Sequence, residues 1–310
     1  MKKIFAIVLA LALVLCASAM AEVNTKVALI TMDQMDEHWV SVKQGADDKV
    51  AELNGEGNNI ELVWLAPETK DNQQQIEKIN AAVADNVNYI IIAANDATSA
   101  NRALQEALDA GIKLIYVDAP ASLQASATFA TDNYAGGVKA GEYLKKVLDD
   151  AGVTSGTIGI VDAQAGVDSC QKRYEGFASV FEGTDFVLGE RQYSDGDNTK
   201  AQELANTLIN NGVIAIYGTN DGATNGAAAA VMDAANNGTT VYCVGWDKSD
   251  SNIAHVERGE LLAFMAQNPN IMGEMAIDAV VAMENGEDLG GKVEDTGVSV
   301  VDINNVAEFK

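Results

Sequence analysis

Short runs of apolar residues alternate along the chain with segments whose apolar residues recur at helical spacing. In the first part of the chain these runs lie at 26–32, 60–65, 89–92 and 112–117. After the first run, Trp39, Val42 and Ala46 recur every three to four residues. Continuous runs rich in β-forming residues, separated by amphipathic helices, are typical of βαβ units around a buried parallel sheet. The pattern therefore predicts an α/β fold.

The same alternation begins again in the second half. Apolar runs lie at 157–161, 186–188, 213–217, 241–244, 261–265 and 298–301. The chain has 310 residues, with 27 Gly and 3 Pro, which suits two domains with many tight turns. No long Pro- or Ser-rich linker separates the halves. We therefore predict two Rossmann-like parallel-sheet lobes joined by a hinge of several short, strand-like crossings.

The first 21 residues differ from the rest and predict a secretory signal peptide. Lys2 and Lys3 precede an apolar run at 4–15, and small residues lead up to Ala21. This order is that of a signal peptide cleaved after Ala21. A membrane anchor is the alternative, but the run is short for a bilayer. Cys16 leaves lipid anchoring as a second alternative, which the leucine before it disfavours. We expect the mature protein in the periplasm.

Charge and cysteine content exclude some classes of function. The formal net charge is −25, so the chain lacks the cationic surface that nucleic acid requires. Beyond Cys16, only Cys170 and Cys243 remain. Cys243 lies in an apolar run typical of a buried strand, so we expect two unpaired thiols, although a disulfide is the alternative in an exported protein.

Polar side chains follow most of the predicted strands. Asp118 comes directly after the run at 112–117. Asp247 follows the run at 241–244 after Gly245 and Trp246, and Asn220 follows the run at 213–217. Ligands of open parallel sheets bind at these carboxyl ends. Carboxylates and amides suit a polyhydroxylated ligand, and Trp39 or Trp246 could stack on a sugar ring. The alternatives are helix N-caps for the polar residues and core positions for both tryptophans.

Seven short segments occur in a characteristic order and spacing. They are VALI at 27–30, WVSVKQG at 39–45, LIYVD at 114–118, ATDNYAGG at 130–137, RYEGF at 173–177, TND at 219–221 and VGWD at 244–247. With them the whole mature chain resembles the periplasmic sugar-binding proteins of the ribose and galactose type, which are related to the ligand-binding domains of Lac-repressor-like regulators. The resemblance implies the type I periplasmic binding protein fold, with one lobe at 22–131 plus about 268–297 and the other at 132–267 plus about 298–310.

The resemblance also implies a set of ligand contacts. Position by position, they fall on Asp36 (Glu37 if the loop is shifted by one), His38, Trp39, Asp118, Thr131, Asn220, Trp246, Asp247 and Gln267. Family members also have an Arg in the loop after the first strand of the second lobe. The matching position in this chain is Gln171, and Asp168 is the second choice. Ribose binders also have Arg where this chain has Ala119. These departures leave more acids than usual, so an unusual polyol or an amine-bearing ligand stays open.

Three functions are compatible with this set of residues. The first is a binding protein that captures a monosaccharide or polyol by lobe closure and delivers it to the membrane permease of an ABC importer. The second is a sensor that feeds a chemoreceptor or kinase, with the same fold and site. The third is an enzyme, which the absence of the P-loop, G-x-G-x-x-G and G-x-S-x-G patterns disfavours. His38 and His255 are far apart, so we expect no metal. We also expect no cofactor and a monomer.

Overall fold

A computed structural model describes residues 25–163 and 165–310. The predicted signal peptide and Cys16 lie outside the described residues. Contacts divide the chain into a first unit, which contains the residues up to Ala130 and Pro269–Glu294, and a second unit, Thr131–Asn268 with Asp295–Lys310. The chain therefore passes between the units three times. The last of these boundaries falls three residues before the expected position at 297.

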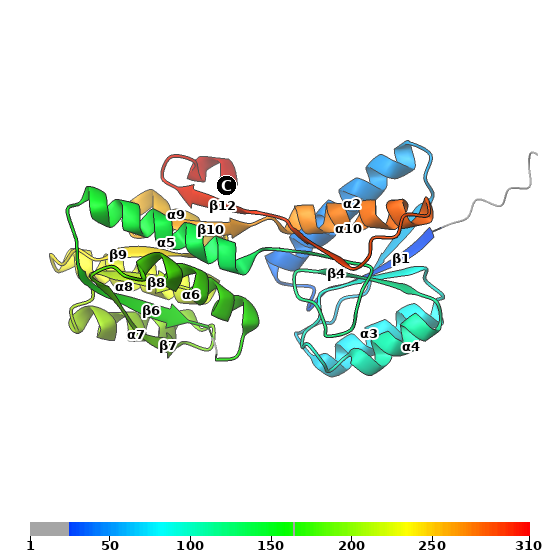
Figure 1. Cartoon of the computed structure of the whole chain (residues 1–310), viewed down its shortest axis with the longest axis horizontal. Helices are drawn as coiled ribbons and strands as arrows, with labels where there is room; N and C mark the ends of the chain where they lie inside the picture. Colours follow the sequence, from blue (N-terminus) through cyan, green and yellow to red (C-terminus); the bar gives the residue numbers. More distant parts are fainter. Residues whose placement is uncertain (1–24, 164) are drawn as a thin grey trace, which may run out of the picture. The chain divides into compact units, whose positions relative to one another are not determined.

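The first unit is a six-stranded sheet with helices on both faces (Figure 1). Its elements are β1 (Thr25–Ile30), α2 (Glu37–Gly55), β2 (Ile60–Trp64), α3 (Asn72–Ala84), β3 (Tyr89–Ile92), α4 (Asn101–Asp109), β4 (Lys113–Val117), β5 (Ala127–Ala130), α10 (Pro269–Glu284) and β11 (Lys292–Asp295). The strand order is β11-β5-β4-β3-β1-β2, and the pairs among β1 to β5 are parallel.

Alternation along β1 explains the two layers of helices. Successive side chains of a strand point to opposite faces. Val27 and Leu29 belong to the core shared with α2 and α10, whereas Ala28 and Ile30 belong to the core shared with α3 and α4. Both faces are covered, which is why the strand reads as a continuous apolar run in the sequence.

The second unit repeats this architecture. Its elements are α5 (Asn133–Asp150), β6 (Gly156–Asp162), α6 (Asp168–Phe181), β7 (Phe186–Tyr193), α7 (Asn198–Asn210), β8 (Ala215–Gly218), α8 (Asp221–Asn236), β9 (Tyr242–Trp246), α9 (Asp250–Arg258), β10 (Ala263–Gln267), β12 (Val298–Asp302) and a 3₁₀ turn (Val306–Phe309). The strand order is β12-β10-β9-β8-β6-β7, with β12 antiparallel to β10. The α/β prediction is confirmed, and the short strand β11, with the sequence KVED, was missed because it has no apolar run.

Each sheet reverses its strand order at one point. In the first unit this point lies between β1 and β3, and in the second between β6 and β8. Crossover connections leave in opposite directions there, so a crevice opens at the carboxyl ends of the two strands. We call the edge at which the parallel strands of a unit end its carboxyl edge.

One pair of helices in each unit packs at backbone contact. A Cβ added at Gly273 of α10 would lie 2.0 Å from the carbonyl oxygen of Val42 in α2. In the second unit, a Cβ at Gly176 of α6 would lie 2.0 Å from the carbonyl oxygen of Tyr134 in α5. Real side chains do not approach so closely, so only glycine allows these two crossings.

Both cysteines of the second unit are free, as expected, and both are buried. Burial raises the pKa of the Cys243 thiol to about 12. Among the described residues, no helix is both long and apolar enough to cross a membrane.

Candidate functional site

In the first unit, the loop after β1 brings His38 toward Asp118. The Asp36 side chain accepts a hydrogen bond from the backbone N–H of His38 at 2.9 Å and caps α2. Asp118 follows β4 with φ of 58°, a left-handed conformation that Asp tolerates better than most residues. Its Oδ2 lies 3.8 Å from His38 Nε2. These side chains give the carboxyl edge of the first unit one carboxylate beside one imidazole.

Trp39 lies under this pair rather than on the surface. Its side chain is 5% exposed and belongs to the core shared with α2 and α10. The His38 ring meets the Trp39 ring edge to face, with centroids 4.6 Å apart. The structure therefore gives Trp39 the core position that the sequence left open, and its contact with a ligand stays a prediction.

A buried amide, Gln75 of α3, bridges the residues that follow β1 and β3. Its Nε2 donates to the carbonyl oxygens of Thr31, after β1, at 3.4 Å and of Ala93, after β3, at 2.9 Å, and its Oε1 accepts from the backbone N–H of Asn95 at 2.9 Å. Gln75 is 1% exposed. Sequence reasoning missed it, although a glutamine at a core-facing position of an amphipathic helix is a usable signal.

In the second unit, Asp247 is held by three neighbours, one of which is the backbone N–H of Asp221, which donates to Oδ2 at 3.2 Å. Asp247 follows β9 with φ of 72°. Its Oδ1 accepts from Gln267 Nε2 at 2.7 Å, and its Oδ2 lies 3.6 Å from Arg173 Nη1. Asp247 and Gln267, which the sequence places 20 residues apart, are thus direct partners at this edge.

Arg173 of α6 is a buried cation that sequence reasoning passed over. It is 5% exposed. Its Nε donates to Asn133 Oδ1 at 2.8 Å, and its Nη1 donates to the carbonyl oxygen of Thr219 at 2.9 Å. The guanidinium also lies over the Trp246 ring, 3.9 Å from the centroid. Arg173 offsets the charge of Asp247, so this edge is less acidic than the sequence suggests.

Trp246 supports that guanidinium from within the core. It has no exposed surface, and its Nε1 donates to the Tyr217 hydroxyl at 2.7 Å. Burial raises the pKa of Tyr217, which stays a neutral partner. Contact between Trp246 and a ligand stays a prediction, and the structure shows the core alternative.

The remaining predicted residues of the second unit have different surroundings. Asn220 caps α8 by accepting from the backbone N–H of Ala223 at 3.1 Å. Asp168 is exposed and pairs with Lys172 of the same helix at 2.7 Å. Gln171 accepts from the Arg191 guanidinium through Oε1, and its Nε2 donates to Glu175 at 2.7 Å. The structure does not bring Asp168 into contact with Asp247 or its partners.

Unsatisfied polar atoms mark both carboxyl edges. Three predicted residues carry a buried polar atom without a hydrogen-bond partner among the described residues, and these atoms are His38 Nε2, Thr131 Oγ1 and Gln267 Oε1. Asn95 Nδ2, beside Gln75, is one of five further such atoms among the described residues. Buried polar groups without partners are uncommon and costly. These atoms are therefore places where a ligand can form the missing hydrogen bonds.

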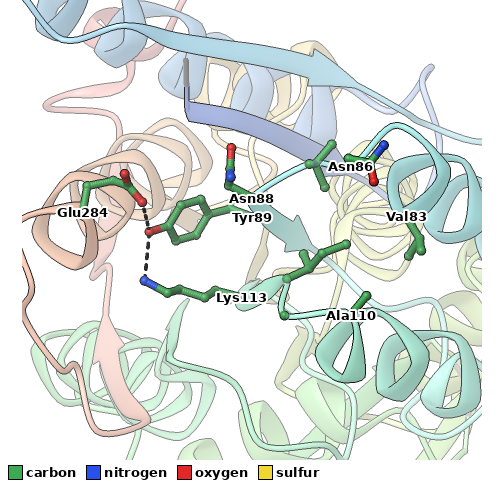
Figure 2. Close-up of a pocket in the computed structure, with 10 residues that line it drawn as sticks. Val83, Asn86, Asn88, Tyr89, Ala110, Lys113 and Glu284 are labelled. Atoms are coloured by element: carbon green, nitrogen blue, oxygen red, sulfur yellow. Dashed lines mark hydrogen bonds between the residues drawn. The ribbon is translucent and has the colours of Figure 1, made fainter. Parts of the chain in front are cut away.

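A cavity of about 300 Å³ lies at the other end of the first sheet, where β3 and β4 begin (Figure 2). Tyr89 donates to Glu284 at 2.5 Å and accepts from Lys113 at 3.2 Å. Burial raises the pKa of the Tyr89 hydroxyl, so it stays a neutral bridge between the two charged groups. None of the predicted site residues lines this cavity, and its three ionisable groups satisfy one another.

The described residues include no group of three or more His, Cys, Asp or Glu side chains that could hold a metal ion. The carboxyl edges instead offer amides, hydroxyls and carboxylates that lie beside His38 or Arg173. These groups can form hydrogen bonds with an organic ligand.

Comparison with known proteins identifies the class. A family model described as a periplasmic binding protein domain matches residues 27–288, and the chain belongs to this family of binding proteins. The chain is 28% identical over 296 residues to the ribose import binding protein RbsB of Haemophilus influenzae, covering 94% of this chain and 97% of that one. It is 29% identical over 285 residues to the D-allose-binding periplasmic protein of Escherichia coli, covering 88% of each chain.

The solved structures show the same fold. The sugar-binding protein of a sugar ABC transporter from Bacillus halodurans matches with a TM-score of 0.83 at 22% identity, covering 93% of this chain and all of that chain. The expected type I periplasmic binding protein fold, two α/β lobes with mainly parallel sheets, is confirmed.

Proposed function

We propose that this chain is an extracytoplasmic solute-binding protein that captures a monosaccharide or polyol and delivers it to an ABC importer. Its family and the functions for which its relatives are named, ribose import and D-allose binding, support the proposal. Export through the predicted signal peptide, with cleavage after Ala21, is part of the proposal. So is a monomeric state, which suits a carrier that a permease must engage and release.

The observation that carries the proposal is the set of unpartnered polar atoms at the carboxyl edges. Gln267 Oε1 and Thr131 Oγ1 in the second unit, and His38 Nε2 in the first, are buried without a hydrogen bond among the described residues. A polyhydroxylated ligand carries hydroxyls that both donate and accept, so it can satisfy all three kinds of atom. An apolar ligand would leave them unsatisfied.

The charge balance favours a neutral ligand over an amine. Asp247 is paired with Arg173, and the buried Asp162 is paired with Arg191. Asp118 has only His38 near it among the ion pairs of the described residues. The carboxylates of the second unit are therefore neutralised by guanidinium groups, which weakens their attraction for an ammonium ion, while Asp118 remains to accept hydrogen bonds from hydroxyls.

Capture follows from differential affinity. We propose that residues of both units contact the same ligand, so that binding favours whichever arrangement of the units lets both edges reach it. The permease would then engage the liganded form. A chemoreceptor that engages the same form is an additional proposed partner.

The test is a melting-temperature panel on protein freed of carried-over ligand by unfolding and refolding. The panel contains D-ribose, D-allose, D-galactose, myo-inositol, sugar alcohols and small amines. A ligand at about a hundred times its Kd stabilises the folded state by roughly 2.7 kcal/mol, which raises Tm by several degrees at about 2–4 °C per kcal/mol. A shift with one sugar or polyol but not its stereoisomers supports the proposal. A shift with amines alone contradicts it, as does turnover of any sugar.

A further inference from the structure

A fully buried carboxylate lies at the point where the second sheet reverses its order. Asp162, the last residue of β6, has no exposed surface. Its Oδ1 accepts from Thr219 Oγ1 at 2.6 Å, and its Oδ2 accepts from Arg191 Nε at 2.5 Å. Arg191 Nη2 forms an ion pair with the same oxygen. A buried carboxylate needs such a partner, because an uncompensated charge in the interior is very costly.

Arg191 is held on several sides. It lies on β7, two residues before the strand ends. Its guanidinium lies 4.8 Å from the ring centroid of Tyr174 and 5.6 Å from that of Tyr193. Its Nη1 donates to Gln171 Oε1. The side chain is nevertheless 14% exposed, so part of this fixed guanidinium reaches the surface.

The contacts leave donors free for a ligand. A guanidinium has five N–H groups. The partners among the described residues use Nε, Nη1 and Nη2 once each. One N–H on Nη1 and one on Nη2 therefore remain, on a planar group that can donate to two adjacent oxygen atoms.

Arg191 is connected to the predicted ligand contacts through a series of polar contacts. Thr219 links the Asp162–Arg191 pair to Arg173, because its hydroxyl donates to Asp162 and its carbonyl oxygen accepts from Arg173 at 2.9 Å. Arg173 in turn lies 3.6 Å from Asp247. Gln171 has both ends of its amide engaged, by Arg191 and by Glu175.

We infer that Arg191 is the specificity-determining residue of the second unit. It donates two hydrogen bonds to adjacent oxygens of the ligand, and Asp162 and Gln171 act as its positioning residues. This inference rests on the proposed function and narrows it to ligands that present two neighbouring oxygen acceptors, such as vicinal hydroxyls. An ammonium group at that place is disfavoured, because it and the guanidinium are both hydrogen-bond donors.

The test compares Arg191→Lys with wild type by isothermal titration calorimetry. The probe is the compound of the panel D-ribose, D-allose, D-galactose and myo-inositol that binds most tightly, together with its monodeoxy analogues. Lysine keeps a charge for Asp162 but lacks the planar group, so we expect Kd to rise at least tenfold. In wild type, at least one deoxy analogue binds at least tenfold more weakly than the parent. In Arg191→Lys this ratio falls to about two, because the donors that read the missing hydroxyl are gone.

A matched control is Arg102→Lys, since Arg102 is 92% exposed on α4 of the first unit. It should leave Kd and the deoxy ratios unchanged. Circular dichroism spectra and melting curves of the unliganded proteins check that Arg191→Lys folds. The double variant Arg191→Gln with Asp162→Asn is a second, charge-neutral variant, and we expect it to lose the same discrimination between the parent sugar and its deoxy analogues. Wild-type affinity and wild-type deoxy ratios in both folded variants overturn the inference and leave the proposed function intact. Absence of binding to wild type by every sugar and polyol overturns both.

Discussion

The two units have the same strand order up to their fifth strand, but they satisfy their carboxyl edges with different chemistry. In the first unit a neutral amide, Gln75, bridges the crevice between the two central strands. In the second unit a buried carboxylate, Asp162, lies at the equivalent point, where it accepts from Thr219 after β8 and forms an ion pair with Arg191 of β7 on the other side of β6. A second pair, Arg173 with Asp247, is linked to it through Thr219. One topology therefore supports a neutral edge and a charged edge.

This difference has a consequence for ligand recognition. Guanidinium groups in the second unit are fixed by buried partners and aromatic rings, so they are preorganised as donors. The first unit contributes Asp118 and His38, which are partly exposed and less constrained. We expect the second unit to determine which oxygens are recognised and the first unit to contribute acceptor strength.

The largest effect should come from breaking the charged edge. Arg191→Ala leaves Asp162 buried without its cation, and removal of one partner of a buried pair costs about 3–5 kcal/mol. Urea unfolding followed by circular dichroism measures this. The double variant Asp162→Asn with Arg191→Met should recover much of the loss, because no unpaired charge remains. Equal destabilisation in the single and double variants would show that the charge pairing is not the cause.

Replacing the glycine at the close helix crossing of each unit by alanine should destabilise the two units by similar amounts. Gly176→Ala and Gly273→Ala each place a Cβ 2.0 Å from a carbonyl oxygen of the neighbouring helix. Overpacking of this kind costs about 1–3 kcal/mol, measured by urea unfolding. Gly55→Ala is the control, because no atom lies within 4 Å of its added Cβ, and it should not destabilise. A clear difference between Gly176 and Gly273 would contradict the equivalence of the two helix pairs.

The neutral edge should be less sensitive than the charged one. Gln75→Leu removes the bonds to the carbonyl of Ala93 and the N–H of Asn95, which leaves buried backbone groups unsatisfied at a cost of about 1–3 kcal/mol. Thermal unfolding of this variant and of Arg191→Ala shows which edge contributes more to the stability of the fold. A loss in Gln75→Leu as large as in Arg191→Ala would remove the distinction between them.

Thiol labelling distinguishes the units, because both thiols belong to one of them. Cys170 and Cys243 both lie in the second unit and are buried, and burial raises the pKa of each thiol. We expect negligible reaction with Ellman's reagent at pH 8 in native wild type and two thiols in urea, in protein without the signal segment. Arg191→Ala should label faster than wild type, whereas Gln75→Leu should not. Fast labelling of native wild type would contradict the burial of these thiols.

Much of this architecture was predictable because its causes are local in the sequence. Apolar runs covered on both faces predicted the parallel strands, and the polar residues after them, such as Asp118 and Asp247, identified the carboxyl edges. Whether each tryptophan lies at the ligand site or in the core was not predictable, since Trp246 has the same apolar neighbours in the sequence whether it stacks on a ligand or lies beneath Arg173.

The missed residues depend on partners that are distant in the sequence. Arg191 lies in the part of β7 beyond the predicted run at 186–188, and only the fold brings it to Asp162, 29 residues away. Arg173 was noticed in a helical motif, but its role depends on Thr219 and Asp247. Gln75 looks like an ordinary helix residue until the strands around it are placed.

The most direct test of the central claim is a calorimetric titration of one sugar into three proteins. These are wild type, Asp118→Asn from the first unit and Asp247→Asn from the second, with the panel sugar that raises Tm the most. We predict one site per wild-type chain and at least tenfold weaker binding in each variant, because under the proposed function each aspartate accepts hydrogen bonds from the same ligand. Wild-type affinity in both variants would contradict the account, since the sugar would then bind away from the carboxyl edges.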